Sequence, residues 1–319
     1  MRNYLIKRLL LAVPTVIGVT LLIFFVMRIL PGDPLTLIYG ENTGIYILSD
    51  EELKAARHSL GLDKPLYQQY FGWMGDVASG ELGKSFWRDE PIREVITRRG
   101  PITAQIALMA IAMSWMIGLP AGVLAATRRN TKTDLFTRTL MTFFQAIPSF
   151  WLGTSFILVA VIFFTWRPPI QIAYLWSDPV ANLQMTLGPA IAMGLGIAAS
   201  IGRMSRTTLL EVIREDYVRT ARAKGLSEKV VIARHVVKNA LLPVITVSGL
   251  QLATLLGGSV AVEQAFAVPG LGTALVQAIT ERDWMVIQNL VLLYGLTFVV
   301  INLLIDLSYA WIDPRIRYD

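Results

Sequence analysis

The segment 80–85 contains residue types that bind nucleotide phosphates, because Gly83, Lys84 and Ser85 match the end of a phosphate-binding loop. In the full pattern, G-x-x-x-x-G-K-[ST], backbone N–H groups surround the phosphates. The first glycine of the pattern falls at position 78, where this chain has Ala78, and no β-strand pattern precedes it. We therefore interpret the segment as a turn. We expect the chain itself to bind no cofactor, neither ATP nor Mg²⁺.

The composition argues against most catalytic chemistry. The chain has no Cys and two His residues, His58 and His235, in 319 residues. A disulfide framework, a thiolate metal site and a cysteine nucleophile are therefore excluded, and a zinc enzyme or a serine-triad enzyme is disfavoured. A membrane enzyme would need His, Asp or Glu clustered near one face, and the sequence shows no such cluster. We expect a protein that is not an enzyme.

Polar and ionisable residues in or beside long apolar runs are costly in a membrane and often functional. Five of them are candidates for a translocation path or a gate: Gln251, Thr254, Glu263, Asn302 and Asp306. Asn302 and Asp306 are four residues apart and share a helix face. Asp306 is either a carboxylate of the path or, as we favour, an interfacial carboxylate with a basic or helical partner. Glu263 is either part of a gate at the outer mouth or a solvated charge.

The most informative segment of the chain is basic. Residues 203–238 contain nine of the 29 Lys and Arg residues, mixed with acidic and apolar residues instead of forming one block. This pattern is typical of short helices that pack on another surface. Gly225 has the position of a helix C-cap, and Ser227 has that of the next N-cap. Spacing alone leaves two interpretations open: a rigid elbow that contacts a cytoplasmic partner, or a basic loop that rests on anionic lipid.

Six long apolar runs must position these residues. Hydrophobic residues make up 54% of the chain and charged residues 16%, against about 45–50% and about 25% in globular proteins. Each run free of charged residues holds 19 to 28 residues, enough for a helix to cross a bilayer core of about 30 Å. We predict one domain, 1–319, with transmembrane helices over 9–30, 102–127, 139–165, 184–203, 239–262 and 285–309, an outer loop over 31–99 and an inner loop over 204–238.

The distribution of basic residues predicts that both termini lie in the cytoplasm. With the N-terminus inside, the inner segments hold 18 Lys and Arg residues, whereas the short outer loops hold two, Arg167 and Arg282. Arg28, at the outer end of the first helix, raises the outer number to three. The long outer loop carries eight, but loops beyond about 60 residues weigh little in this rule. Membrane topology thus accounts for the net charge of +6, and we expect no nucleic-acid partner.

The basic segment resembles a known motif. Residues 217–227, with Arg234, His235 and the run 239–243, resemble the EAA loop of importer permeases of the ATP-binding-cassette (ABC) superfamily, in its peptide/nickel branch. Residues 30–34, 257–272 and 282–317 also resemble the B-type subunit of that branch. The chain departs from the general superfamily pattern in having Arg219-Thr220-Ala221 in place of Glu-Ala-Ala, and 17 residues between Gly225 and Pro243. Both departures point to the peptide/nickel branch.

The resemblance implies an all-α polytopic protein with the type I ABC importer permease fold, located in the cytoplasmic (inner) membrane. It also implies three kinds of partner: a second homologous permease subunit, two cytoplasmic ATPase subunits that hold ATP and Mg²⁺, and an extracytoplasmic solute-binding protein. The transported solute would be a peptide, a nickel chelate or a similar small solute.

By position, the resemblance assigns ATPase coupling to one stretch: Arg219, Thr220, Ala221, Arg222, Lys224, Gly225, Leu226 and Ser227. The alternative function is a stand-alone secondary carrier or channel. A carrier would need intramembrane charges or broken helices in corresponding halves of the chain, and neither is evident from the sequence.

Overall fold

The structure is a computed structural model that describes residues 2–29, 51, 54, 58, 63–167, 169 and 171–312. Helices make up nearly all the secondary structure of these residues, and a single isolated β-bridge joins Lys84 to Pro91 within them. The helices are α1 (Arg2–Ile29), α4 (Leu66–Ser79), α5 (Ile92–Thr127), α6 (Lys132–Ala146), α7 (Ser149–Phe164), α8 (Pro179–Val212), α9 (Asp216–Ala223), α10 (Glu228–Val230), the π-helical η1 (Val231–Val237), α11 (Lys238–Ala265), α12 (Leu271–Glu281) and α13 (Trp284–Ile312).

Five helical segments of the described residues are long and apolar enough to cross a membrane. They are Leu10–Ile29, Ile92–Thr127, Pro179–Val212, Glu228–Leu255 and Trp284–Ile305. The number rises to six if α6 and α7, which meet at a sharp bend, count as one span. The polytopic all-α architecture expected from the six apolar runs is therefore confirmed.

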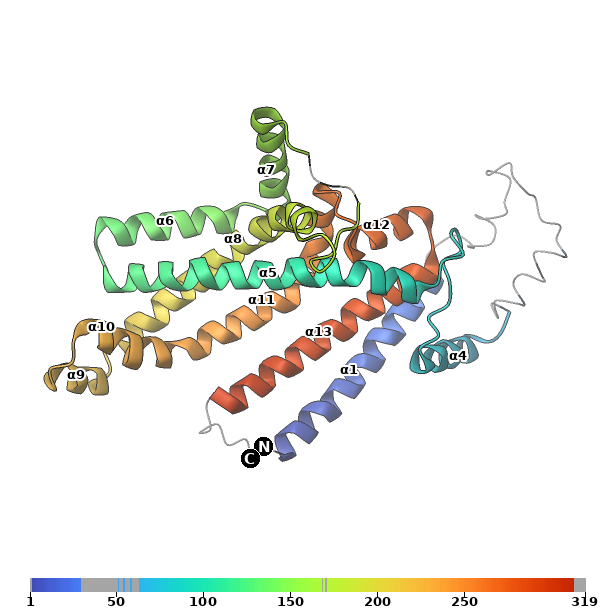
Figure 1. The fold of residues 1–319 in the computed structure, drawn as a ribbon. Coiled ribbons are helices and arrows are strands. Elements are labelled where there is room, and N and C mark those ends of the chain that lie inside the picture. Colours follow the sequence, from blue (N-terminus) through green and yellow to red (C-terminus); the bar gives the residue numbers. More distant parts are fainter. Residues whose placement is uncertain are drawn as a thin grey trace.

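The third predicted span differs from the structure, because residues 139–165 do not form one helix. α6 ends at Ala146, α7 begins at Ser149, and their axes differ by 96°. Ile147 is extended (φ −86°, ψ 125°), the conformation favoured before proline, and Pro148 has no N–H to continue the helix. The prediction of a continuous helix is wrong here. α7 projects from the other helices (Figure 1).

The centre of the molecule is the contact between α5 and α8, which pack against each other along much of their length. Small residues allow this close approach. A Cβ atom on Gly118 would overlap the backbone of Ala198, and one on Gly122 would lie 2.6 Å from the carbonyl oxygen of Gly202 and 2.6 Å from Cβ of Ser205. Larger apolar residues complete the core around this contact: Ile102, Ile106, Met185, Met193, Ile197, Ile201, Val262 and Phe266.

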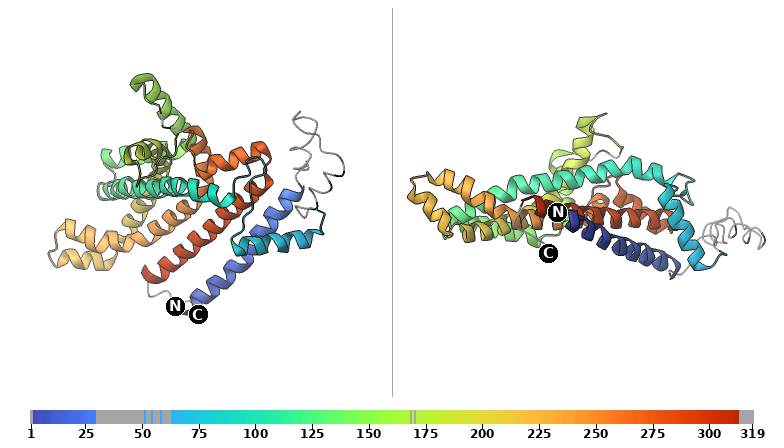
Figure 2. Two further views of the ribbon diagram at one scale, coloured as in Figure 1. Left: turned by 45° about the vertical axis from the view of Figure 1, so that its right-hand side comes forward. Right: turned by 90° about the horizontal axis from the view of Figure 1, so that it is seen from below.

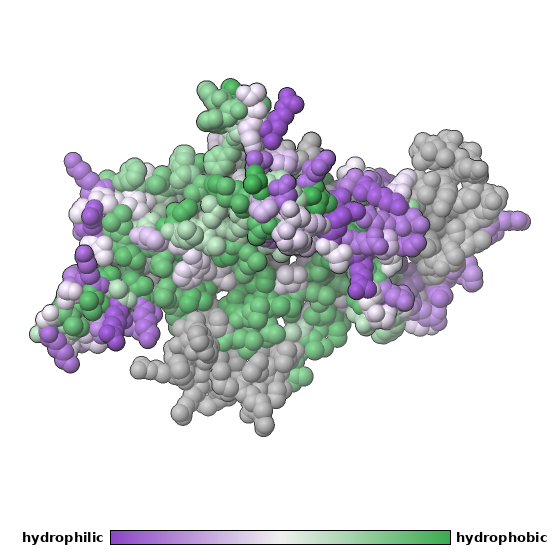
Figure 3. All heavy atoms as spheres, in the orientation of Figure 1, coloured by the Kyte–Doolittle hydropathy of each residue, from purple (hydrophilic) through white to green (hydrophobic). Residues whose placement is uncertain are grey.

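The polar parts of the chain lie at two opposite ends of the long helices. α9 and α10 lie at one end, and α4, α12 and the segment 80–91 lie at the other (Figures 1 and 2). The start of α1 and the end of α13 lie side by side, away from α4 and α12. Between the polar ends, Figure 3 shows a broad apolar surface. Large apolar side chains of α5 and α6 are exposed, among them Leu108, Met116, Phe136 and Leu140, and an apolar band of this kind fits the hydrocarbon region of a bilayer.

The segment 80–91, with its phosphate-loop-like residues, is a turn fixed to the corner between α12 and α13. The Ser85 hydroxyl donates to Oδ2 of Asp283 at 2.6 Å, and the Phe86 N–H donates to the same oxygen at 3.0 Å. Asp283 is 1% exposed, and its Oδ1 accepts the N–H of Val286 in the first turn of α13. The interpretation of Gly83, Lys84 and Ser85 as part of a turn agrees with this geometry.

The packing of α5 on α8 predicts the effect of a single added methyl group. Gly122→Ala should lower the stability of the chain by roughly 1–3 kcal/mol, because the new Cβ meets backbone that cannot move aside cheaply. The midpoint of thermal unfolding of the purified protein in detergent, followed by tryptophan fluorescence, should fall by several degrees. Gly257→Ala is the matched control, because a Cβ at that helical position meets nothing within 4 Å. Equal midpoints for the two variants would contradict the packing argument.

Candidate coupling site and translocation residues

α9 is a short amphipathic helix between α8 and α10. Asp216 lies in its first turn and Arg222 in its last turn, where their charges complement the helix dipole. Val218 and Ala221, three residues apart, are buried, whereas Arg219 and its neighbours on the other side are exposed. The helix therefore has one apolar side that packs on the protein and one polar side that faces outward.

The apolar side of α9 rests on the ends of the long helices. Val218 is 0% exposed and Ala221 6% exposed. They pack in one cluster with Ala126 of α5, Leu209 of α8, Val231 and Val236 of η1, and Ala240 of α11. In addition, the Asn239 side chain of α11 donates to the Tyr217 hydroxyl of α9 at 3.0 Å. A displacement of α9 must therefore displace these helices as well.

The polar side of α9 carries solvated charge. Arg219 is 73% exposed, and its 3.4 Å contact with Asp216 lies on the same surface, where ion pairs contribute little. Arg222 donates two hydrogen bonds to Glu228, at 2.8 and 3.1 Å, and so links the end of α9 to the start of α10. These bonds favour the charged guanidinium and raise the pKa of Arg222 above its ordinary value. Thr220 and Lys224 are also exposed.

The turn from α9 to α10 depends on Gly225. Its φ of +76° lies in the left-handed region that favours glycine, while a Cβ there would meet nothing within 4 Å. The backbone conformation, and not space, thus requires glycine, although the C-cap of α9 is Lys224 and Gly225 follows it by one residue. Leu226 is 40% exposed, and Ser227 is the N-cap of α10, with its carbonyl accepting the N–H groups of Val230 and Val231. The predicted coupling residues lie in one folded elbow, residues 216–227, and of these predicted residues only Ala221 is buried.

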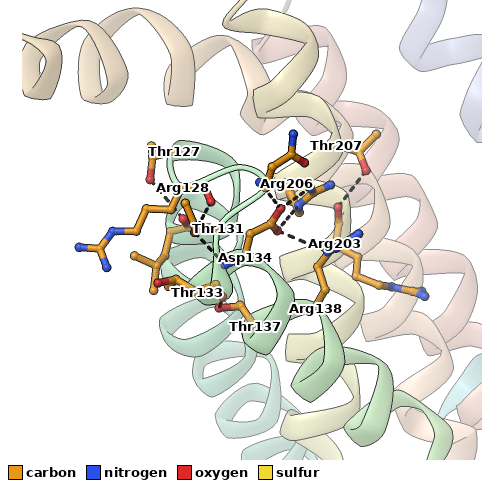
Figure 4. Close-up of polar contacts among 12 residues, drawn as sticks. Thr127, Arg128, Thr131, Thr133, Asp134, Thr137, Arg138, Arg203, Arg206 and Thr207 are labelled. Atoms are coloured by element: carbon orange, nitrogen blue, oxygen red, sulfur yellow. Dashed lines mark hydrogen bonds and ion pairs between the residues drawn. The ribbon is translucent and has the colours of Figure 1, made fainter.

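A buried ion pair that sequence reasoning missed joins α6 to α8. Arg206 donates two hydrogen bonds to Asp134, from Nε to Oδ1 and from Nη2 to Oδ2, each 2.8 Å long. Asp134 is 0% exposed, also accepts the Asn130 N–H at 3.0 Å, and lies 3.4 Å from Arg138 (Figure 4). Arg206 precedes α9 by ten residues on the same helix that leads into it. The pair therefore fixes α6 to the helix that carries the elbow.

The predicted path residues lie in separate places. On α11, Gln251 donates to the Ser200 hydroxyl of α8 at 3.4 Å, and Thr254 donates to the Gln251 carbonyl at 2.9 Å. On α13, Asn302 donates to a carbonyl of its own helix and lines a cavity of about 150 Å³ against α1. Asp306 follows on α13, but its side chain lies outside the described residues. The structure thus brings Gln251 together with Thr254, and it does not join this pair to Asn302.

Glu263 is buried and not solvated. It lies in the last turn of α11 and is 0% exposed, so its interpretation as a solvated charge is wrong. Oε1 accepts the Thr103 hydroxyl of α5 at 2.9 Å, and Oε2 accepts the N–H groups of Gly272 at 2.8 Å and Thr273 at 3.3 Å. The Thr103 hydroxyl oxygen also accepts the Leu271 N–H at 2.8 Å. Glu263 therefore connects α11 with α5 and with the start of α12.

The long apolar helices define an integral membrane protein with an exposed basic elbow at one end. No group of three or more His, Cys, Asp or Glu side chains in the described part of the chain could hold a metal ion. Residues 118–318 match the family described as the inner membrane component of binding-protein-dependent transport systems, and residues 1–107 match the N-terminal unit of such membrane components. The chain belongs to this family. It is a multi-pass inner-membrane permease component of an ABC importer.

Relatives of known name match the chain over its whole length. A putative peptide transport system permease protein of Brucella abortus is 39% identical over 319 residues, covering 100% of both chains. The di/tripeptide transport system permease protein of Pseudomonas aeruginosa is 39% identical and covers 100% of this chain and 99% of its own. The glutathione transport system permease protein of Escherichia coli is 38% identical and covers 100% of both chains. The predicted peptide-transport branch of the permeases is confirmed by these relatives.

Solved structures show the same fold. An inward-facing MetNI methionine ABC transporter aligns with a TM-score of 0.56 and 22% identity, over 70% of this chain and 99% of the other. An amino acid ABC transporter crystallised with histidines aligns with a TM-score of 0.51 and 13% identity, over 67% of this chain and 92% of the other. The likeness confirms the type I importer permease fold.

The Asp134–Arg206 pair predicts a large loss of stability when its charge is removed. Asp134→Asn keeps the size of the side chain but leaves the Arg206 guanidinium without its counter-charge, which should cost about 2–3 kcal/mol. The thermal unfolding midpoint in detergent should therefore fall. Asp216→Asn, which removes a carboxylate that is 95% exposed, should leave the midpoint unchanged. A fall of the same size in both variants would show that the buried pair does not hold α6 to α8.

Proposed function

We propose that this chain and a second, homologous permease subunit form the translocation path of an importer for peptides or similar small solutes. Two cytoplasmic ATPase subunits would bind and hydrolyse ATP, and an extracytoplasmic solute-binding protein would deliver the solute. The full-length relatives named for peptide, di/tripeptide and glutathione transport support this substrate class. Their named solutes share short chains of amide bonds, which makes peptides the common chemistry. In this proposal the chain itself catalyses no reaction.

The observation that carries the proposal is the folded elbow of residues 216–227. A rigid surface is needed if the movement of an ATPase is to be passed to membrane helices, because a flexible loop would absorb it. α9 meets this need, since Val218 and Ala221 fix it to three long helices while Arg219, Thr220, Lys224 and Leu226 remain exposed. We infer that this exposed side docks in a groove of an ATPase subunit and that ATP-driven closure pushes on it.

The proposed orientation places the elbow and both termini in the cytoplasm. The basic residues concentrated in the inner segments, 18 against two or three in the short outer loops, favour it. The geometry is consistent with it, since α9 and α10 lie at the opposite end of the long helices from α4 and α12. α12 and the segment 80–91 would then face the solute-binding protein. Gln251, Thr254, Asn302 and Asp306 remain proposed residues of the path.

The elbow predicts variants in which ATP hydrolysis no longer drives transport. Gly225→Pro should uncouple the two, because proline fixes φ near −65° where the native turn has +76°. Arg219→Glu should do the same by reversing an exposed charge of the docking surface. In proteoliposomes that contain the complete complex, uptake per ATP hydrolysed should fall about tenfold or more, as expected for the loss of 1.4 kcal/mol or more of coupling free energy.

The matched control for the charge reversal is Arg129→Glu. Arg129 is an exposed arginine of the α5–α6 turn, outside the elbow, and it would lie on the same side of the membrane. This variant should transport normally and should couple uptake to hydrolysis like the wild type. Normal coupling in Arg219→Glu and Gly225→Pro would exclude the elbow as the docking surface.

The substrate class predicts a competition result. Proteoliposomes with the complete complex and its binding protein should import a radiolabelled dipeptide when ATP is supplied inside the vesicles, on the side of the ATPases. Excess unlabelled dipeptide or tripeptide should suppress the uptake, whereas the free amino acids of the same composition should not, because they lack the amide bond that the named relatives' solutes share. Suppression by free amino acids alone would refute the peptide assignment.

A further inference from the structure

α12 is a short helix that joins the ends of two membrane spans, α11 and α13. One side of it is buried, with Leu271, Ala274 and Ala278 in an apolar cluster at this end of the molecule. The other members of the cluster are Ile92 and Val95 of α5, and Val286 and Leu290 of α13. The cluster therefore packs α12 against both α5 and α13.

Buried carboxylates hold both ends of α12. At its C-terminal end, Asp283 accepts hydrogen bonds from Ser85 and Phe86 in the segment before α5. At its N-terminal end, Glu263 accepts the N–H groups of Gly272 and Thr273, where the helix dipole favours a negative charge. α12 cannot shift relative to α11 without breaking its bonds to Glu263, or relative to the segment before α5 without breaking those of Asp283.

The site around Glu263 is built for close contact with the backbone of α12. A Cβ atom on Gly270 or on Gly272 would overlap the Glu263 carboxylate. The Ser259 hydroxyl also donates to Glu263 from one turn earlier on α11. Glu263 is therefore surrounded by donors on three helices, although no sequence motif for catalysis or metal binding includes it.

The carboxylate chemistry of Glu263 is essential to this arrangement. Each of its two oxygens accepts at least one hydrogen bond, Oε1 from Thr103 and Oε2 from two backbone N–H groups. Glutamine has the same shape but offers one acceptor oxygen and one NH₂ donor. In Glu263→Gln, an NH₂ group that faces the N-terminus of α12 would meet two N–H donors, whereas one that faces Thr103 would reverse that bond and leave the hydroxyl proton without its acceptor.

We propose that Glu263 is a positioning residue that holds α12 against α5 and α11 and thereby seals the outer end of the translocation path in the resting state. The proposal rests on the proposed function and orientation. Alternating access requires the outer ends of the spans to part during transport, and α12 bridges two of these ends. Glu263 and Thr103 hold the outer ends of α5 and α11 to α12 as one unit, so that the seal opens only when the whole unit moves.

The test is passive leak through the complete complex. Proteoliposomes that contain both permease subunits and the ATPases are loaded with a radiolabelled dipeptide, and its release is measured without ATP and without binding protein. Glu263→Gln should raise the leak about tenfold or more, because it removes at least one hydrogen bond to a charged group. A substitution of a residue with a purely structural role would lower the yield of complex without adding a leak.

Ser248→Ala is the control on α11. Ser248 is buried, but among the described contacts it bonds only to its own helix, so the leak of this variant should equal that of the wild type.

A second pair of variants decides the case if Glu263→Gln does not assemble. Thr103→Val removes the hydroxyl that both donates to Glu263 and accepts from Leu271, and it should leak. Thr103→Ser keeps the hydroxyl, so its dipeptide leak should equal that of the wild type. Wild-type complex that imports the dipeptide with ATP, together with assembled Glu263→Gln or Thr103→Val that shows no leak, would overturn the role of Glu263. Wild-type complex that imports no peptide would instead overturn the proposed function.

Discussion

A polar group buried inside a protein has no water to bond to, so each donor and acceptor must find its partner within the protein. The described residues meet this constraint with three buried carboxylates, Asp134, Glu263 and Asp283, none more than 1% exposed. Each accepts a backbone N–H at the start of a helix (α12 and α13) or, for Asp134, in the turn just before its helix, α6. Each also accepts a side-chain donor from an element far along the chain. The same groups that satisfy the helix ends therefore join the helices.

Between these joints the long helices are held by apolar and small-residue packing. Gly118 and Gly122 bring α5 so close to α8 that even a methyl group would overlap the facing backbone. Such an interface resists sliding because any displacement moves backbone against backbone. The combination of fixed joints and tightly packed helices favours movement of whole helices as rigid bodies, which is the form of motion that alternating access needs.

The sequence predicts the parts of this structure that depend on local pattern. Apolar runs of sufficient length predict the spans, and the spacing of Gly225 and Ser227 predicts the elbow. The bend at Pro148 is not predictable from its proline alone, because Pro101, Pro120 and Pro243 lie inside continuous helices. The ring of Phe266 lies against Gly153 of α7, a tertiary contact that no local pattern specifies. The Asp134–Arg206 pair and the Glu263–Thr103 bond join residues 72 and 160 positions apart, so spacing gives no signal for either.

α5, like α11, touches both ends of the proposed mechanism. Ala126, near one end, packs in the cluster that carries α9, and Thr103, toward the other, bonds to Glu263 and to the start of α12. These residues lie on one continuous helix and are about 35 Å apart along its axis. Because Gly118 and Gly122 fix the intervening turns to α8, a push on the elbow should tilt α5 and α8 together. The tilt must then either carry α12 with it or strain the bonds of Thr103. The elbow and the outer seal are therefore mechanically linked through α5, and also through α11, which carries both Ala240 and Glu263.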